Sequence, residues 1–269
     1  MTVDLEAHVG PVAATEPVQG FFGNETFRVR TVAGETYYFK SGPGMLAEAR
    51  ACALAVGVPA PRVVASGTSS GVEYLIQRAV LGSPVESSDT AALTGAGRSL
   101  VKLHQIAGDG FGRLSAARLP TWTGWLSEQV GSLDALVDAG LLPDDHRARL
   151  IELVATRSTE PGRPVLLHGD LHPRHVYAAD GVLTAIIDWG DALYGDPLFD
   201  LARFSIAGPD ATTAVLDGYG LALTPDLERT FALYRAVWSA MVCRIELEVG
   251  GDWFQAHLDR IADDLHRLG

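Results

Sequence analysis

The chain has 269 residues, of which 47% are hydrophobic and 20% are charged, so it can bury a sizeable core and is not a disordered protein. Its formal net charge of −12 argues against nucleic-acid binding and favours a cationic small molecule, unless the charge serves solubility alone. No apolar run could span a membrane, no secretory pattern opens the chain, and Cys52 and Cys243 lie far apart in apolar segments, which predicts a cytoplasmic protein without membrane contact.

The N-terminal part predicts a small β-rich unit with one helix. Residues 27–32 and 35–40 are rich in aromatic and β-branched side chains and flank a glycine-containing turn, which indicates a hairpin. Apolar residues at helical spacing over 45–56 predict a helix, and glycine and proline end it. Residues 62–65 and 72–77 predict a second hairpin around a glycine-rich turn.

After a connector at 78–85, the pattern changes to helices interrupted by a few short strands. This order predicts an α+β fold with a small β-rich lobe, a connector and a larger helical lobe, and a cleft between two such lobes is a natural ligand site. The lobes would comprise a β-rich unit at 1–77 and a larger, mostly helical unit at 86–269. In chain order, we expect helices at 90–106, 126–137 and 144–156, strands at 165–167, 176–177 and 183–187, and further helices from residue 197 onward.

Titratable residues directly follow these strands. Asp170 and His175 lie in the loop after the first strand, and Asp188 follows the last one. Because a hairpin can bring strand ends together, His175 and Asp188 could share one hard cation, with Asp170 beside it. Mg²⁺ prefers few protein ligands and completes its coordination with substrate phosphates, so the pattern suits phosphoryl transfer with Asp170 accepting a hydroxyl proton. The alternative is that these are turn and capping residues.

Lys40 is one of only two lysines in the chain and ends a predicted strand. Glu48 lies in the helix that follows. A strand lysine that pairs with a helix glutamate and reaches nucleotide phosphates is the protein-kinase arrangement. The turn before the first strand contains Gly23 and Asn24, and its backbone amides could cover the phosphates. Taken singly, a glycine-containing turn and a helix glutamate are weak signals.

These motifs resemble the aminoglycoside phosphotransferase family, which has a protein-kinase-like fold. The resemblance covers roughly residues 20–205 and rests on His168-Gly169-Asp170-Leu171-His172-Pro173, Ile187-Asp188-Trp189-Gly190, Tyr194-Gly195-Asp196-Pro197 and Asp200-Leu201-Ala202. It implies that Asp170 is the catalytic base, that Asp188 is the main Mg²⁺ ligand, and that Asp200 braces the catalytic loop.

The resemblance also implies a nucleotide site. Lys40 would hold the α- and β-phosphates, and Glu48 would orient Lys40. The segment that contains Gln77 and Ala79 would pass the purine ring of ATP or GTP and offer it backbone groups.

The chain departs from the common family pattern at His175, where most members have asparagine. Macrolide kinases and some aminoglycoside 2″-kinases are similar in carrying histidine there. A neutral imidazole can bind a metal, so His175 would be the second metal ligand, and GTP stays open as the donor. The alternative is that His175 only positions the loop.

The family binds antibiotics with acidic side chains of the C-terminal helices. The corresponding candidates here are Asp191, Glu246 and Asp252, with Trp238 and Trp253 as apolar walls. Ordinary helix-surface charge explains each acidic residue equally well.

The sequence thus predicts a kinase that transfers the γ-phosphate of Mg²⁺-bound ATP or GTP to a hydroxyl of an antibiotic, acting as a monomer or homodimer. One alternative is a metabolite kinase for a compound such as choline, homoserine or a sugar amine. Two further alternatives are a binding module that has lost catalysis and a metal-dependent hydrolase that uses the dense histidines.

Overall fold

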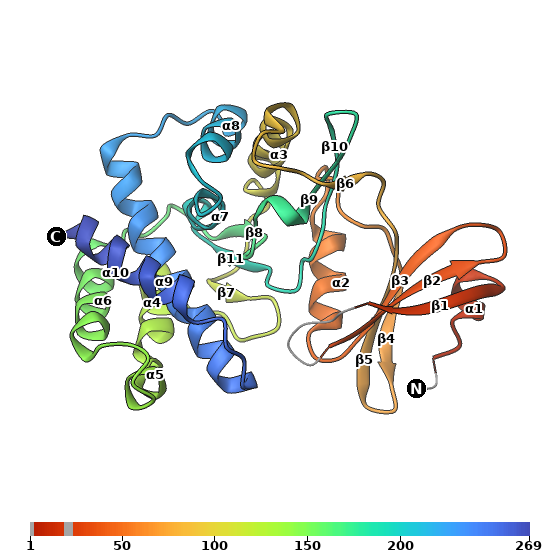
Figure 1. Ribbon diagram of the computed structural model, residues 1–269, viewed down its shortest axis with the longest axis horizontal. Helices are drawn as coiled ribbons and strands as arrows, with labels where there is room; N and C mark the ends of the chain where they lie inside the picture. The colour runs from red at the N-terminus through yellow and green to blue at the C-terminus, as the bar shows by residue number, and fades with distance from the viewer. Residues whose placement is uncertain (1–2, 19–23) are drawn as a thin grey trace.

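The computed structural model describes residues 3–18 and 24–269, which divide into a sheet-rich N-terminal part and a helical C-terminal part (Figure 1). After the short helix α1 (Glu6–Val9), the N-terminal sheet has five antiparallel strands within the described ranges. Helix α2 (Met45–Leu54) lies on the side of this sheet that faces the C-terminal part (Figure 1). In spatial order the strands are β1 (Val12–Val18), β2 (Glu25–Thr31), β3 (Thr36–Ser41), β5 (Val72–Arg78) and β4 (Val63–Ser69).

Both predicted N-terminal hairpins are confirmed, and their register decides where Lys40 points. Strand β3 pairs Phe39 with Phe27 of β2 and Lys40 with Leu75 of β5. Successive side chains of a strand point to opposite faces. Phe39 is fully buried in a cluster with Val29, so Lys40 projects from the other face of the sheet, where α2 packs.

Strand β1 has no counterpart in the sequence-based expectations. It lies at the edge of the sheet, and among the described strands it pairs only with β2. Its residues are half-buried or exposed, and Pro17 lacks the N–H that a central strand needs. An edge strand with one partner needs little apolar patterning, so the sequence carried only a weak signal for it.

The connector between the two parts is tied to a hairpin of the C-terminal part. Strand β6 (Ser83–Pro84) pairs with β9 (Val176–Ala179), which pairs in turn with β10 (Val182–Ile186). At Gly82, φ is +87°, and a Cβ atom would lie 2.0 Å from the Ala178 carbonyl oxygen, so only glycine fits this approach. The lobe boundaries at residues 77 and 86 stay a prediction.

A second small sheet in the C-terminal part joins β7 (Gly112–Arg113), β11 (Leu193–Gly195) and β8 (Val165–Leu167). Since β11 pairs with β8 over all three residues, the loop that follows β8 lies beside the segment that precedes β11. The strands at 165–167, 176–177 and 183–187 were predicted and are confirmed within one or two residues.

The remaining helices pack into one large core. Helix α7 contacts α8 and α9, and α3 packs along α8. Trp122 stacks on Trp125 with ring centroids 4.7 Å apart and meets Phe199 edge-on at 5.5 Å, contacts that contribute about 0.5–1.5 kcal/mol each beyond area burial. No helix in the described ranges is long and apolar enough to cross a membrane. The helices are α3 (Thr90–Leu103), α4 (Trp122–Gly131), α5 (Asp134–Asp138), α6 (Asp144–Arg157), α7 (Pro197–Ser205), α8 (Pro209–Tyr219), α9 (Pro225–Val249) and α10 (Gln255–Leu268).

The single helix predicted at 126–137 is wrong, because two helices, α4 and α5, replace it. The Ser132 hydroxyl donates to the carbonyls of Glu128 and Gln129 and so satisfies the end of α4. The start of α4 also lies earlier than expected, because the Thr121 hydroxyl accepts the Gly124 N–H as a helix cap. Apolar spacing continued through the break and concealed it.

Candidate active site

Helix α7 holds the loop that follows β8. The carboxylate of Asp200, fully buried on α7, accepts the backbone N–H groups of His168 and Gly169, each at 2.8 Å. His104 contacts the same carboxylate at 3.2 Å. At Gly169, φ is +86° and a Cβ atom would lie 2.2 Å from the Asp191 carbonyl oxygen, so the loop needs glycine here. The geometry agrees with the expectation that Asp200 braces this loop.

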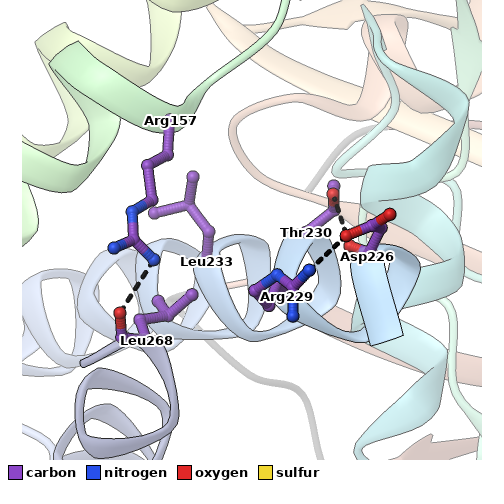
Figure 2. Close-up of a pocket in the computed structure, with 6 residues that line it drawn as sticks. All are labelled: Arg157, Asp226, Arg229, Thr230, Leu233 and Leu268. Atoms are coloured by element: carbon purple, nitrogen blue, oxygen red, sulfur yellow. Dashed lines mark hydrogen bonds and ion pairs between the residues drawn. The ribbon is translucent and has the colours of Figure 1, made fainter. Parts of the chain in front are cut away.

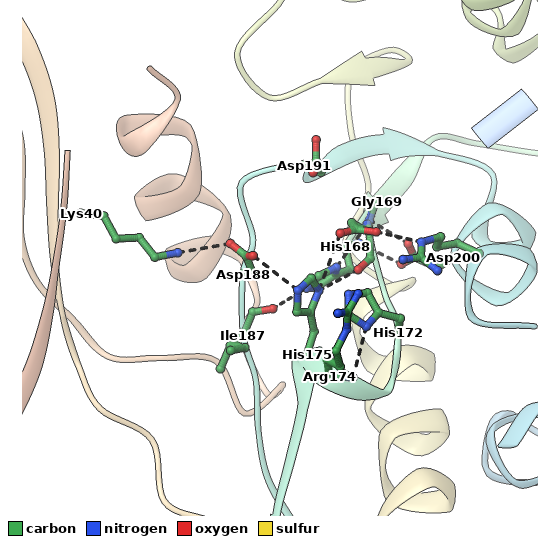
Figure 3. Close-up of polar contacts among 12 residues, drawn as sticks. Lys40, His168, Gly169, His172, Arg174, His175, Ile187, Asp188, Asp191 and Asp200 are labelled. Atoms are coloured by element: carbon green, nitrogen blue, oxygen red, sulfur yellow. Dashed lines mark hydrogen bonds and ion pairs between the residues drawn. The ribbon is translucent and has the colours of Figure 1, made fainter. Parts of the chain in front are cut away.

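The structure brings Lys40, His175 and Asp188 together, although Lys40 and Asp188 are 148 residues apart in the sequence (Figure 3). Glu48 joins this cluster through Lys40. The Lys40 Nζ donates to Glu48 Oε1 at 2.8 Å and to Asp188 Oδ1 at 3.2 Å. On its other side, Asp188 Oδ2 lies 3.4 Å from His175 Nε2. Asp170 Oδ2 lies 3.9 Å from His175 Nδ1. The spatial grouping that the motifs predicted is therefore present.

Electrostatics keep the Lys40 end of the cluster charged. Burial by itself would lower the pKa of Lys40, because it disfavours the charged ammonium. The carboxylates of Glu48 and Asp188 have the larger combined effect and raise the pKa of Lys40. Burial also works against the Asp188 carboxylate, but Lys40 and His175 outweigh it and lower the pKa of Asp188. Glu48 is buried on α2, whereas half of the Asp188 side chain is exposed, so Asp188 can still meet a ligand.

Asp188 adopts an unusual backbone conformation. Its φ of +64° lies in the left-handed region, which side chains with a Cβ atom rarely adopt. The next residue, Trp189, is fully buried, donates its indole N–H to the Ile186 carbonyl and packs on the His168 ring at 4.8 Å. The His168 ring in turn bonds the Ile187 carbonyl at 2.8 Å. Surrounding contacts thus hold the strained backbone of Asp188 in place, as is common at functional sites.

The tautomer of His175 follows from its hydrogen bond. Its Nδ1 lies 2.9 Å from the Asp170 carbonyl oxygen, which can only accept, so Nδ1 carries the proton. Burial is the largest influence on His175 and lowers its pKa, which favours the neutral ring. The Nε2 lone pair then faces the Asp188 carboxylate, and two acceptors at 3.4 Å attract a shared cation. The donor set fits a divalent metal ion.

A second grouping, Asp170, His172 and His175, offers ligand atoms within 4.8 Å of one another. However, His172 Nδ1 accepts the Arg174 N–H at 3.2 Å, so in the neutral ring Nε2 carries the proton and has no lone pair for a metal. Burial, the largest cause, lowers the pKa of His172 to about 2 and keeps the ring neutral. This geometry disfavours the dinuclear hydrolase alternative.

The nucleotide-binding candidates are only partly placed. Gly23 lies outside the described residues. Asn24 precedes β2, and its Oδ1 would lie 2.1 Å from a Cβ atom at Gly42. Gln77 is buried on β5, and the Ala79 N–H is already bonded to the Thr36 carbonyl at 2.9 Å, which leaves the Ala79 carbonyl for a purine. Their roles stay predictions.

Two of the three acidic substrate candidates already have partners. Asp191 forms an ion pair with Arg113. Glu246 is buried and accepts the Trp253 N–H at 3.3 Å, which stabilises the turn between α9 and α10. Asp252 is exposed. Their roles in substrate binding stay untested.

Arg203 was not among the sequence-based candidates, although its spacing of three residues from Asp200 pointed to it. Its Nε donates to Asp170 Oδ1 at 2.8 Å, and its guanidinium lies over the Trp238 ring at 3.8 Å. Arg203 follows Asp200 by three residues on α7, so both side chains leave the same face of the helix. The motif ending at Ala202 stops one residue short of it.

A separate hollow of about 540 Å³ shares no residue with this cluster (Figure 2). Its polar groups are already paired: Arg157 donates to the Leu268 carbonyl at 2.8 Å, and Arg229 pairs with Asp226. Thr230 and Leu233 complete its lining.

The fold is similar to those of solved small-molecule kinases. A candidate fructosamine-3-kinase from Thermobifida fusca matches with a TM-score of 0.76 and 21% identity, covering 98% of this chain and 97% of that one. The aminoglycoside phosphotransferase APH(4)-Ia matches with a TM-score of 0.74 and 17% identity over 98% and 97%. The macrolide 2'-phosphotransferase MphH from Brachybacterium faecium matches with a TM-score of 0.69 and 20% identity over 97% and 95%. These likenesses confirm the kinase-like fold.

Sequence comparison identifies the family. The uncharacterized protein YcbJ of Bacillus subtilis is 38% identical to this chain over 61 residues. The match covers 22% of this chain and only 20% of the length of YcbJ. The model of the phosphotransferase enzyme family APH matches residues 15–234, which confirms the resemblance on which the motif assignments rest. The chain therefore belongs to the APH phosphotransferase enzyme family.

Proposed function

We propose that this chain transfers the γ-phosphate of a Mg²⁺-bound nucleoside triphosphate to a hydroxyl group of a small molecule. The observation that carries the proposal is that Lys40, paired with Glu48, meets Asp188 and His175 beside the loop that holds Asp170. Phosphoryl transfer needs cations around the phosphates and a base at the attacking hydroxyl, and this cluster offers both.

Each residue has a distinct task in this reaction. Lys40 binds the phosphates, and Glu48 fixes the direction of its ammonium group. Asp188 and His175 would hold Mg²⁺, which neutralises developing charge on the phosphates when bound. Asp170 accepts the proton of the acceptor hydroxyl as the oxygen attacks the γ-phosphorus atom, and the nucleoside diphosphate leaves.

ATP is the favoured donor, with GTP as the alternative. The similar structure of APH(4)-Ia was solved with ADP and with AMP-PNP, which supports an adenine nucleotide here. A triphosphate donor also suits the cytoplasm, where we place the activity. Titration of the chain with Mg–ATP and Mg–GTP tests this choice, and the molar mass in solution tests whether it acts as a monomer or homodimer.

An antibiotic is the first candidate acceptor. APH(4)-Ia binds hygromycin B, and MphH is a macrolide 2'-phosphotransferase, so two of the similar folds act on antibiotics. The test is a susceptibility profile of a sensitive bacterium that expresses the chain, together with transfer of radiolabelled γ-phosphate to a panel of hydroxylated antibiotics. Phosphorylation of one of them, lost in Asp170→Asn, supports the assignment.

A metabolite acceptor is the second candidate, and the charge beside Asp170 favours it. Arg203 contacts Asp170, while Asp191 and Glu246 are engaged by Arg113 and by a backbone N–H. A polycationic aminoglycoside would find few free carboxylates there. The similarity to a candidate fructosamine-3-kinase agrees with a sugar-amine acceptor. Turnover on such a metabolite, with none on any antibiotic, would remove the resistance assignment.

A further inference from the structure

The two carboxylate oxygens of Asp170 have different surroundings. Oδ1 accepts a hydrogen bond from Arg203 Nε at 2.8 Å. Oδ2 lies 3.9 Å from His175 Nδ1, too far for a hydrogen bond, and accepts none from the residues that the structure describes. One oxygen is therefore anchored, and the other is free to accept a proton.

Arg203 is itself held in a single direction. Its side chain is only 9% exposed, and its guanidinium lies over the Trp238 ring of α9 at 3.8 Å. Trp238 is itself packed in place, because the ring of His257 on α10 lies against it with ring centroids 5.5 Å apart. A guanidinium that stacks on an aromatic face and is excluded from water loses little rotational freedom when it forms a hydrogen bond.

Helix α7 consequently grips three consecutive residues of the catalytic loop. Asp200 accepts the backbone N–H groups of His168 and Gly169, and Arg203 binds the side chain of Asp170. Residues three apart on a helix lie on one face, so a single rigid element sets both the path of the loop and the direction of its carboxylate.

On the basis of the proposed function, we propose that Arg203 is a positioning residue for phosphoryl transfer: it anchors Asp170 Oδ1 so that Oδ2 faces the acceptor hydroxyl. Arg203 acts through Asp170 and needs no contact with the nucleotide. Its removal should therefore lower the rate of the chemical step and leave nucleotide binding in place. If Arg203 only held α7 against α9, its removal would instead lower the melting temperature and leave kcat of the folded enzyme unchanged.

The kinetic test compares Arg203→Met, which removes the charge and keeps much of the volume, with Arg203→Lys, which keeps the charge. The probe is Mg–ATP with water as the acceptor, followed by release of radiolabelled phosphate. We expect Arg203→Met to lower kcat by about 10²-fold, the cost of a misplaced catalytic group, with the KM for Mg–ATP within about twofold. Arg203→Lys should recover part of kcat. Equal kcat values for Arg203→Met and the unaltered chain would overturn the proposal.

Arg235→Met is the matched control. Arg235 is a buried arginine on α9 that pairs with Asp264 at 2.6 Å and with Glu228 at 2.8 Å and donates to the Ser205 hydroxyl of α7 at 3.0 Å, whereas Arg203 donates to Asp170. Its removal should lower the melting temperature and leave kcat of the folded enzyme unchanged. If both arginine variants reduced kcat alike, loss of a buried arginine in general would explain the effect, and the specific role of Arg203 would be refuted.

A double-mutant cycle separates positioning from a structural role. If Arg203 acts only through Asp170, Arg203→Met should cause no further loss of turnover in the Asp170→Asn background. Multiplicative losses of the two substitutions would contradict the proposal.

A crystal structure of Arg203→Met, or of Arg203→Leu if the first variant does not fold, tests the geometry without turnover. We expect the Asp170 carboxylate to rotate away from its present direction, and an unchanged carboxylate would refute the positioning role. If the proposed function itself is wrong, the unaltered chain should not bind Mg–ATP. The crystal structure of the Arg203 variant still tests the contact between Arg203 and Asp170 in that case.

Discussion

The two sides of Asp170 differ in the kind of contact that holds them together: ion pairs on one side and aromatic packing on the other. On the side of Lys40 and Asp188, charged groups from both parts of the chain meet in direct ion pairs of 2.8 and 3.2 Å. On the side of Arg203 and Trp238, a buried guanidinium lies over an aromatic ring, and the nearby acidic groups bond to other protein groups. The first side consists of charged groups paired with one another, whereas the second consists of packed helices and aromatic rings.

This difference follows from what each side would bind. A Mg²⁺-bound triphosphate carries the same charges whatever the acceptor is, so a few fixed ion pairs serve every member of such a family. An acceptor differs from member to member, and packed helices with aromatic surfaces can vary their shape without disturbing the phosphate site. The following predictions test this contrast, beginning with the group between the two sides.

The largest effect is expected for Asp170→Asn. Loss of the base should slow transfer by about 10²- to 10⁴-fold, the usual contribution of general acid–base catalysis, while Mg–ATP affinity stays near normal. Steady-state kinetics and calorimetric titration measure the two quantities. Near-normal turnover of the folded variant would show that Asp170 is not the base.

On the nucleotide side, Lys40→Met leaves the buried Glu48 carboxylate without its partner. Breaking a buried pair in this way costs about 3–5 kcal/mol, which denaturant unfolding measures. The double variant Lys40→Met/Glu48→Gln should recover most of that stability, because the buried charge is gone, but should not recover Mg–ATP binding. Restored nucleotide binding in the double variant would remove Lys40 from the phosphate site.

The metal assignment predicts a smaller effect at His175. His175→Asn, the residue common in the family, should keep measurable activity, whereas His175→Ala should weaken the apparent affinity for Mg²⁺ by about 10- to 100-fold. The measurement is the Mg²⁺ dependence of turnover at saturating nucleotide. An unchanged Mg²⁺ dependence in His175→Ala would favour a role in positioning the loop.

The smallest effect concerns stability on the acceptor side. Burial, followed by the cations of Arg203 and Arg260, lowers the pKa of His257 to about 4. The unfolded chain, with an ordinary histidine pKa of about 6.5, binds this proton more readily, so the free energy of unfolding should fall as the pH drops from about 6.5 to 4, by on the order of 2 kcal/mol.

Denaturant unfolding at several pH values measures this dependence. His257→Gln should flatten the profile between pH 6.5 and 4, whereas His266→Gln, which alters an exposed histidine near the C-terminus, should leave it intact. The same slope in His257→Gln and the unaltered chain would contradict the assignment to His257.

The sequence predicted the nucleotide side better than the acceptor side. The candidates on this side lie within or directly after predicted elements: Lys40 ends a strand, Glu48 lies in the next helix, and Asp188 follows a strand. Local pattern and spacing were therefore enough to select them as candidates. Arg203 and Trp238 lie in helices whose apolar periodicity looks like ordinary core packing. Likewise, the break between α4 and α5 depends on hydrogen bonds of Ser132, and apolar spacing does not report such bonds.

Local patterning by itself determined the two-part α+β organisation and the candidates proposed for phosphate chemistry, because alternation, helical spacing and short motifs are properties of neighbouring residues. Only the tertiary structure decided that Lys40 meets Asp188, that Glu246 is occupied by the Trp253 N–H, and that Arg203 holds one oxygen of Asp170. These contacts join segments whose relative positions are set by packing of the whole core, and packing depends on side chains far apart in the chain.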